Sequence, residues 1–129
     1  IQFKEEQDHA TIFFNYLQSR GGRVVLKAIE AVETEWASPL AAFEHTLQHE
    51  QKVTSLINNL MTIAIEEKDY AAQSRLQWFV DEQVEEEENA TDLIQKLRMV
   101  EGNGYGMYQI DQELAARVYK QASPLATAE

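Results

Sequence analysis

The stretch KEEQDHATIFF (Lys4–Phe14) has the spacing of an amphipathic helix, yet it places polar residues where a helix would bury apolar ones. Phe13 marks the apolar stripe, and steps of four and then three residues back from Phe13 lead to His9 and Glu6. Side chains at these spacings share one helix face. The stretch therefore predicts a helix whose buried stripe carries an imidazole and a carboxylate.

Composition limits the classes of partner. The chain has 129 residues and a formal net charge of −11, which argues against a nucleic-acid partner because nucleic-acid-binding surfaces are basic. The acidity fits a solvated surface or a protein that handles cations. No cysteine is present, so disulfides and thiolate metal sites are excluded. No apolar stretch approaches the ~20 residues that span a bilayer. We also see no signal-like start, so we expect no membrane partner and a cytoplasmic protein.

Periodic apolar residues and cap signals predict three long helices. The first runs from the N-terminus to about Arg20, where Gly21-Gly22 ends it. The second begins at Ser38-Pro39, an N-cap followed by the proline favoured at the first helical position, and continues to about Lys68. Asp69 can cap the third helix, which reaches about Val100.

The C-terminal part predicts a shorter element. GNGYG at 102–106 is typical of a loop, and we expect Asp111 to cap a short helix that ends near Lys120. Residues 121–129 predict a flexible tail. By its length, the whole chain, 1–129, is expected to form a single domain.

The connectors predict the directions of the helices. Few residues around Asp69 join the second and third helices, so these two should be antiparallel neighbours. The connector from Gly21 to Ala37 is long: ~17 extended residues span up to roughly 56 Å. A helix of ~30 residues is only about 45 Å long. The first two helices can therefore be parallel, which gives an all-α bundle with one long crossover.

Both longer helices interrupt their apolar stripes with polar residues. In the second helix the interruption is Glu50, and in the third helix the interruptions are Gln83 and Glu86. The apolar positions around them are Phe43, Leu47, Thr54, Ile57, Met61 and Ala64 in the second helix, and Leu76, Phe79, Ala90, Leu93 and Leu97 in the third. Three helices thus each direct a carboxylate toward the core.

A buried carboxylate needs a partner, because leaving it isolated costs several kcal/mol. No Lys or Arg lies on these stripes to neutralise Glu6, Glu50 and Glu86. A hydrogen-bonded polar network, uptake of protons by the carboxylates or a bound cation can each resolve the cost, and metal binding is the simplest of these. Oxygen ligands with one imidazole suit iron or manganese, and zinc can imitate them. The Glu-x-x-His spacing of Glu6 and His9 places both side chains on one face, as shared metal ligation requires.

The motifs EEQDH (5–9), HEQ (49–51) and DEQVEEE (81–87) resemble the metal-binding motifs of prokaryotic non-haem ferritins. The flanking text RGGRVVL, WASPLAAFEH, EEKDY, QWFVDEQ and GNGYGMYQID is similar as well, so the resemblance covers essentially the whole chain. It implies a ferritin-like four-helix bundle with one long crossover and a short C-terminal fifth helix. In that comparison the first helix and the start of the second are absent from this chain.

The resemblance also assigns roles to residues. It implies that Glu6 bridges two irons, that His9 ligates the first, and that Glu50 and Glu86 hold the second. A third metal site would be built from Glu5, Glu82 and Glu85, with Glu86 shared. Gln83 would lie beside the second iron, so the implied catalytic set is Glu6, His9, Glu50, Gln83 and Glu86. Within the acidic run at 85–88, we expect Glu87 and Glu88 to point outward.

The implied function is an iron-storage subunit with ferroxidase activity. Such a subunit oxidises Fe(II) with dioxygen or peroxide at a di-iron centre and stores ferric mineral in a hollow shell of 24 identical subunits. Haem is not expected, because Gln7 stands where a bacterioferritin carries its haem-ligating Met.

Two alternatives remain open at this point. The chain could be a truncated, catalytically impaired subunit that serves only storage or assembly, since the absent helix would supply a Glu ligand to the first iron. If that segment was cleaved and stays bound, it would be a partner. The other alternative is a di-iron oxygenase, which would need a pocket for an organic substrate.

Overall fold

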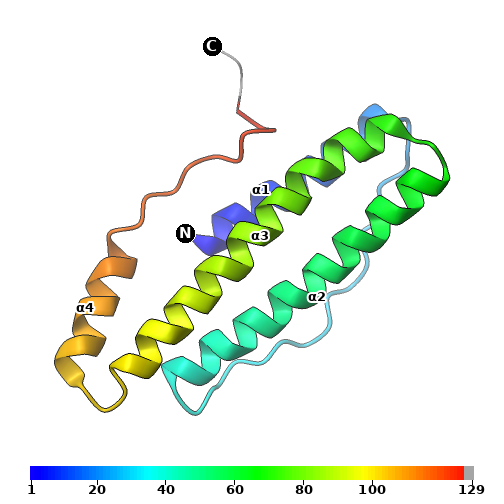
Figure 1. The fold of residues 1–129 in the computed structure, drawn as a ribbon. Coiled ribbons are helices and arrows are strands. Elements are labelled where there is room, and N and C mark those ends of the chain that lie inside the picture. The colour runs from blue at the N-terminus through cyan, green and yellow to red at the C-terminus, as the bar shows by residue number, and fades with distance from the viewer. Residues whose placement is uncertain (127–129) are drawn as a thin grey trace. The chain divides into compact units, whose positions relative to one another are not determined.

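The computed structural model describes residues 1–126 and is built from helices (Figure 1). The helices are α1 (Gln2–Ser19), α2 (Pro39–Glu66), α3 (Tyr70–Met99) and α4 (Gly104–Ala115). No strand occurs among the described residues, so the prediction of an all-α chain is confirmed. None of the described helices combines the length and the apolar character that a membrane span needs.

The chain divides into two compact units. The hairpin unit comprises Glu33–Ile110, and the terminal unit comprises Ile1–Val32 together with the segment from Asp111 onward. The predictions of a single domain and of a crossover between parallel helices concern both units together, and they stay predictions.

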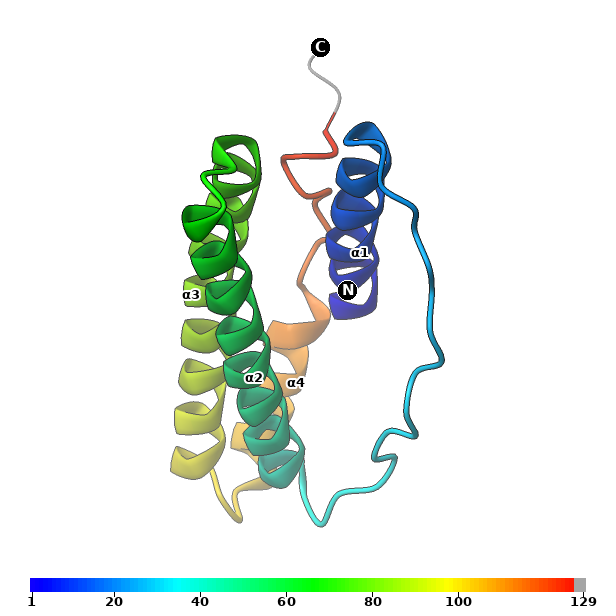
Figure 2. The ribbon, with the colours of Figure 1, turned by 90° about the vertical axis from the view of Figure 1, so that its right-hand side faces the viewer.

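The hairpin unit consists mainly of α2 and α3, which lie side by side and antiparallel in Figures 1 and 2. The Ser38 hydroxyl accepts the Ala41 N–H at 3.1 Å and so caps α2. Asp69 caps α3 in the same way, with Ala72 as donor at 3.0 Å. Between the helices, Lys68 adopts a left-handed φ of 55°. Both predicted caps and the antiparallel pairing are therefore confirmed.

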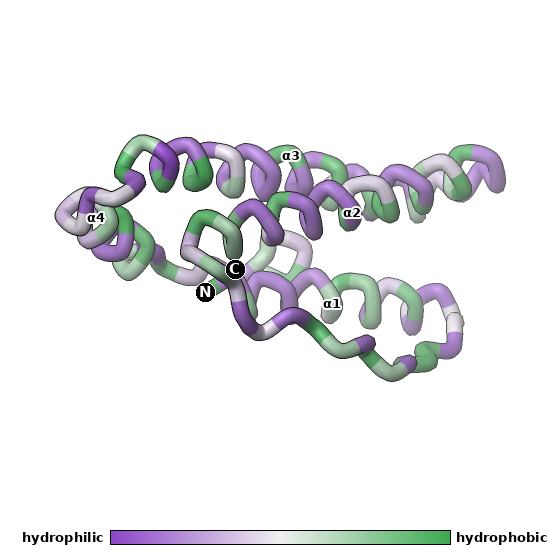
Figure 3. Tube along the Cα trace, turned by 90° about the horizontal axis from the view of Figure 1, so that it is seen from below, coloured by the Kyte–Doolittle hydropathy of each residue, from purple (hydrophilic) through white to green (hydrophobic). Residues whose placement is uncertain are grey.

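Apolar side chains from both helices form the core of the hairpin unit. Figure 3 shows apolar and polar residues alternating along α2 and α3, as an amphipathic pair requires. The buried apolar residues of α2 and α3 are Ile57, Ala64, Leu76, Phe79, Ala90, Ile94 and Leu97. Most of them occupy the stripes that the sequence predicted.

The start of α4 differs from the prediction. The helix begins at Gly104 and ends at Ala115, so Asp111 lies inside it and is not its cap. Asn103 is the cap instead, because its side-chain oxygen accepts the N–H groups of Tyr105 and Gly106, both at 3.1 Å. A Cβ on Gly106 would lie 2.6 Å from the side chain of Val100. Close packing, and not a loop, explains that glycine.

In the terminal unit, α1 ends where the sequence predicted. Gly21 adopts φ +74°, and the Gly22 N–H donates to Leu17 O at 2.8 Å. Residues 116–120 are not helical, contrary to the prediction for the last helix. A turn follows, in which the Leu125 N–H donates to Ala122 O at 2.9 Å. Of the tail predicted at 121–129, residues 127–129 lie outside the described part.

Candidate metal centre

Glu50 and Gln83 are the buried polar residues of the hairpin unit. Their exposed fractions are 6% and 4%, as expected from residues that interrupt apolar stripes. The Gln83 side-chain nitrogen donates to Glu50 Oε2 and to the Glu50 main-chain oxygen, both at 3.3 Å. His49 Nδ1 is 3.9 Å from the other carboxylate oxygen, Oε1. A carboxylate and an amide thus meet inside the helix pair.

A further carboxylate joins this pair through Thr54. Gln83 Nε2 lies 3.3 Å from the Thr54 hydroxyl, and that hydroxyl donates to Glu87 Oε1 at 2.5 Å. The outward orientation predicted for Glu87 is therefore wrong: the side chain is half-buried and contacts α2. A threonine inside an apolar stripe was the sequence signal for this contact, since its hydroxyl needs a partner when it is buried.

The other predicted ligands on α3 differ in exposure. Glu82 and Glu86 are half-buried, whereas Glu85 is exposed. All three lie within three residues of Gln83 along α3, which is one continuous helix through 82–86. The structure thus presents several carboxylates along one stretch of this helix.

In the terminal unit, α1 brings Glu6 and His9 together. His9 Nδ1 is 3.4 Å from Glu6 Oε2, and the side chains are 13% and 51% exposed, respectively. Gln2 donates to the other Glu6 oxygen, Oε1, at 3.1 Å. The predicted common face of Glu6 and His9 is confirmed, but the burial predicted for Glu6 is not found, because half of its side chain is exposed.

The C-terminal segment contacts the acidic face of α1, which the sequence did not predict. Arg117 Nη2 donates to both carboxylate oxygens of Glu5, at 3.0 and 3.2 Å. The Tyr119 hydroxyl donates to Asp8 at 2.8 Å, and this hydrogen bond raises the pKa of Tyr119. The Lys4 ammonium lies 5.3 Å from the centre of the Tyr119 ring. Glu5, a predicted third-site ligand, therefore has a guanidinium partner.

The predicted ligands belong to both units. Glu5, Glu6 and His9 lie in the terminal unit, and Glu50, Glu82, Gln83, Glu85 and Glu86 lie in the hairpin unit. Within residues 1–126, no three His, Asp or Glu side chains gather as a group that could hold a metal ion. The structure therefore shows the Glu6–His9 and Glu50–Gln83 pairs, and the convergence of the full ligand set stays a prediction.

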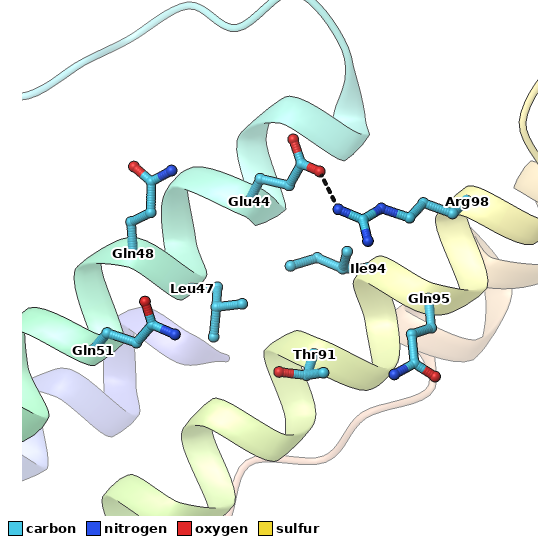
Figure 4. Close-up of a pocket in the computed structure, with 8 residues that line it drawn as sticks. All are labelled: Glu44, Leu47, Gln48, Gln51, Thr91, Ile94, Gln95 and Arg98. Carbon is cyan, nitrogen blue, oxygen red and sulfur yellow. Dashed lines mark hydrogen bonds and ion pairs between the residues drawn. The ribbon is translucent and has the colours of Figure 1, made fainter.

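The hairpin unit also has an open groove, shown in Figure 4, with a volume of about 320 Å³. Its lining includes Gln48, Gln51 and Gln95, and the ion pair of Arg98 with Glu44 lies at one side, at 2.7 Å. None of the predicted metal ligands lines this groove. It therefore offers no substrate pocket for an oxygenase centred on those ligands.

Comparison with known proteins decides the family. A family model described as a ferritin-like domain matches residues 1–100. The chain belongs to the ferritin family. Among curated relatives of this ferritin chain, a probable bacterial non-heme ferritin-like protein from Haemophilus influenzae is 41% identical over 114 residues, which are 88% of this chain and 69% of that protein. A bacterial non-heme ferritin from Staphylococcus aureus is 38% identical over 93% of this chain and 72% of its own length.

Solved structures agree with this assignment. A structure described as a humanized archaeal ferritin matches with a TM-score of 0.91 and 43% identity, over 93% of this chain and 73% of that one. An open-pore ferritin from the archaeon Archaeoglobus fulgidus matches with a TM-score of 0.89 and 46% identity, over 91% and 72% of the two chains. The ferritin-like fold predicted from the motifs is thus confirmed for most of the ferritin chain.

Proposed function

We propose that this chain is a subunit of an iron-storage ferritin that oxidises Fe(II) to Fe(III) at a di-iron centre within the subunit. The ferric product is stored as mineral in a hollow shell of 24 copies. Family membership and the non-heme ferritin relatives support this proposal. Each pair of Fe(II) ions supplies two electrons, which reduce dioxygen to hydrogen peroxide or hydrogen peroxide to water.

The observation that carries the proposal is the environment of Glu50. Its carboxylate is buried, and its partners among the described residues are the neutral amide of Gln83 and, more distantly, His49. Neither partner is Lys or Arg. A buried carboxylate without a fixed positive partner is costly in the folded protein, and a divalent cation removes that cost. The site therefore favours cation binding.

The proposed ligand roles follow the family motif. Glu6 would contribute to both iron sites, His9 would ligate the first iron, and Glu50 with Glu86 would hold the second. Glu5, Glu82 and Glu85 form a third site that shares Glu86. Oxygen ligands with one imidazole are a donor set that iron accepts. We propose no haem, because Gln7 replaces the methionine that would ligate it.

Stopped-flow absorbance tests the proposal. Mixing the metal-free protein with two Fe(II) per chain and dioxygen should give a fast absorbance rise. Glu50→Ala and His9→Ala should each slow the initial rate roughly tenfold or more, because each removes a ligand that orients the metal. The control is Glu88→Ala, which removes an exposed carboxylate from the same acidic run and should leave the rate unchanged.

Two results would argue against this function. Full oxidation rates in both Glu50→Ala and His9→Ala would contradict the centre itself. A wild-type protein that assembles into a shell but oxidises Fe(II) only at the background rate would instead support a subunit for storage or assembly alone.

A further inference from the structure

Four side chains of the hairpin unit form one continuous hydrogen-bonded chain. Glu87 accepts from the Thr54 hydroxyl, the Thr54 oxygen lies 3.3 Å from Gln83 Nε2, and that nitrogen lies 3.3 Å from Glu50 Oε2. The chain thus links a half-buried carboxylate on α3 to the buried carboxylate on α2 that we assign to metal binding.

The direction of each hydrogen bond in this chain is fixed by elementary chemistry. The Thr54 hydroxyl has one hydrogen, which it donates to Glu87 Oε1 in a hydrogen bond. Thr54 must therefore accept from Gln83. The main-chain oxygen of Glu50 is also purely an acceptor, and it faces the same Gln83 atom at 3.3 Å. The Thr54 oxygen and the Glu50 main-chain oxygen thus both require that the NH₂ group of Gln83, and not its carbonyl oxygen, faces them.

The orientation of Gln83 matters for Glu50. With NH₂ toward α2, two amide hydrogens face three oxygens (Thr54 Oγ, Glu50 O and Glu50 Oε2), so at least one hydrogen is shared between two acceptors, and Glu50 Oε2 lies within its reach. A reversed amide would place its carbonyl oxygen against a carboxylate oxygen, which is repulsive. The other oxygen of Glu50, Oε1, lies 3.9 Å from His49 Nδ1, beyond hydrogen-bond distance. One carboxylate oxygen is therefore tethered, and the other is left for a ligand.

We propose that Thr54 and Glu87 are positioning residues for metal binding by Glu50, acting through Gln83. Glu87 orients the Thr54 hydroxyl, Thr54 fixes the Gln83 amide, and the amide holds Glu50 with Oε1 available to a divalent cation. Groups behind a metal ligand typically change metal affinity by about 10- to 100-fold when they are lost. This inference rests on the proposed function, because it assumes that Glu50 binds metal.

Cobalt(II) titration tests the metal consequence without redox chemistry. The visible absorbance of bound cobalt reports binding, and the part lost in Glu50→Gln defines the Glu50-dependent site. Thr54→Val keeps the shape but removes the hydroxyl, and it should weaken that site roughly tenfold or more. Thr54→Ser restores the hydroxyl and should bind within about twofold of wild type. Thr62→Val is the matched control, because the Thr62 hydroxyl donates to Asn58 O within α2 itself.

A double-mutant cycle tests whether Glu87 acts through Thr54. Glu87→Ala should weaken the site as Thr54→Val does, and the double variant should be no weaker than Thr54→Val, because both lie in one chain. Glu88→Ala controls for the loss of one negative charge nearby and should have no such effect. Losses that add in the double variant, or wild-type affinity in Thr54→Val, would overturn the positioning role.

Crystal structures of metal-free wild type and Thr54→Val separate this inference from the proposed function. We expect the variant to lose the contact between Gln83 Nε2 and Glu50 Oε2, with a changed Glu50 rotamer. An unchanged Glu50 and Gln83 would overturn the inference whatever the metal data show. Absence of any Glu50-dependent cobalt site in the wild type would instead overturn the proposed function.

Discussion

The Tyr119 hydroxyl donates a 2.8 Å hydrogen bond to Asp8 Oδ2, and the same oxygen accepts the main-chain N–H of Ala122 at 2.8 Å. One carboxylate of α1 thus holds two points of the C-terminal segment. With Arg117 on Glu5, these contacts fasten that segment along the acidic face of α1.

The first prediction concerns alkaline pH. The hydrogen bond to Asp8 raises the pKa of Tyr119 above its ordinary value of 10.0, and burial and the charges of Asp8 and Glu5 act in the same direction. Because the pKa is raised in the folded state, the folded protein keeps the Tyr119 proton to a higher pH than the unfolded chain does. The contribution of the Tyr119–Asp8 hydrogen bond to the free energy of unfolding is therefore fully present below about pH 10. It is lost as the pH rises through the folded-state pKa of Tyr119. In a pH titration, tyrosinate absorbance should show an ionisation step at a higher pH than that of an exposed tyrosine, and Tyr119→Phe should remove this late step.

Tyr70→Phe serves as the matched control, because Tyr70 is 74% exposed and the substitution leaves Tyr119 intact. The late step should persist in that variant. If Tyr119→Phe titrates like the wild type, the hydrogen bond to Asp8 does not exist in solution.

The second prediction concerns competition at Glu5. Arg117 neutralises this carboxylate, so a cation at the proposed third site must displace the guanidinium. Partly exposed ion pairs contribute about 0.2–1 kcal/mol, so Arg117→Ala should tighten cation binding there by no more than about fivefold. Calorimetric titration with cobalt(II) measures the change. Arg98→Ala, which removes the pair with Glu44, should have no effect; weaker binding in Arg117→Ala would contradict the competition.

The third prediction concerns metal removal. A ligand that binds only the folded state stabilises it by ~2.7 kcal/mol when its free concentration is 100 times its Kd. Cobalt(II) should therefore raise the melting temperature of the wild type, and chelation should reverse the rise. Glu50→Gln should lose most of the rise, whereas Glu44→Gln, in the groove, should keep it. Equal shifts in both variants would place the stabilising metal elsewhere.

The fourth prediction concerns the start of α4. Removing the cap in Asn103→Ala should lower the free energy of unfolding by about 1 kcal/mol, because two N–H groups lose their acceptor. Asn103→Asp should retain most of the stability. Chemical denaturation measures both. Gln109→Ala, an exposed site within the helix, is the control; a similar loss there would mean that capping is not the cause.

The sequence predicted the features that depend on local pattern. Helix ends at Ser38, Asp69 and Gly21 followed from cap chemistry, and the burial of Glu50 and Gln83 followed from their spacing among apolar residues. Each of these features can be predicted from the sequence of a single helix.

Features that depend on neighbouring elements were not predictable in the same way. Periodicity on α3 could not show that Thr54 on α2 reaches Glu87, so Glu87 was wrongly placed outward. Glycines at 102–106 predicted a loop, because the close approach of Gly106 to Val100 is invisible in sequence. The contact of Arg117 with Glu5 joins residues far apart in the chain. The convergence of α1 ligands with those of α2 and α3 is of this kind and stays a prediction.

Anomalous diffraction from crystals soaked anaerobically in Fe(II) shows which side chains bind iron. We expect iron peaks in contact with Glu50 and Glu86, and iron peaks in contact with Glu6 and His9. Iron found only at surface acids such as Glu88, with no peak in contact with Glu50 or His9, would contradict this expectation.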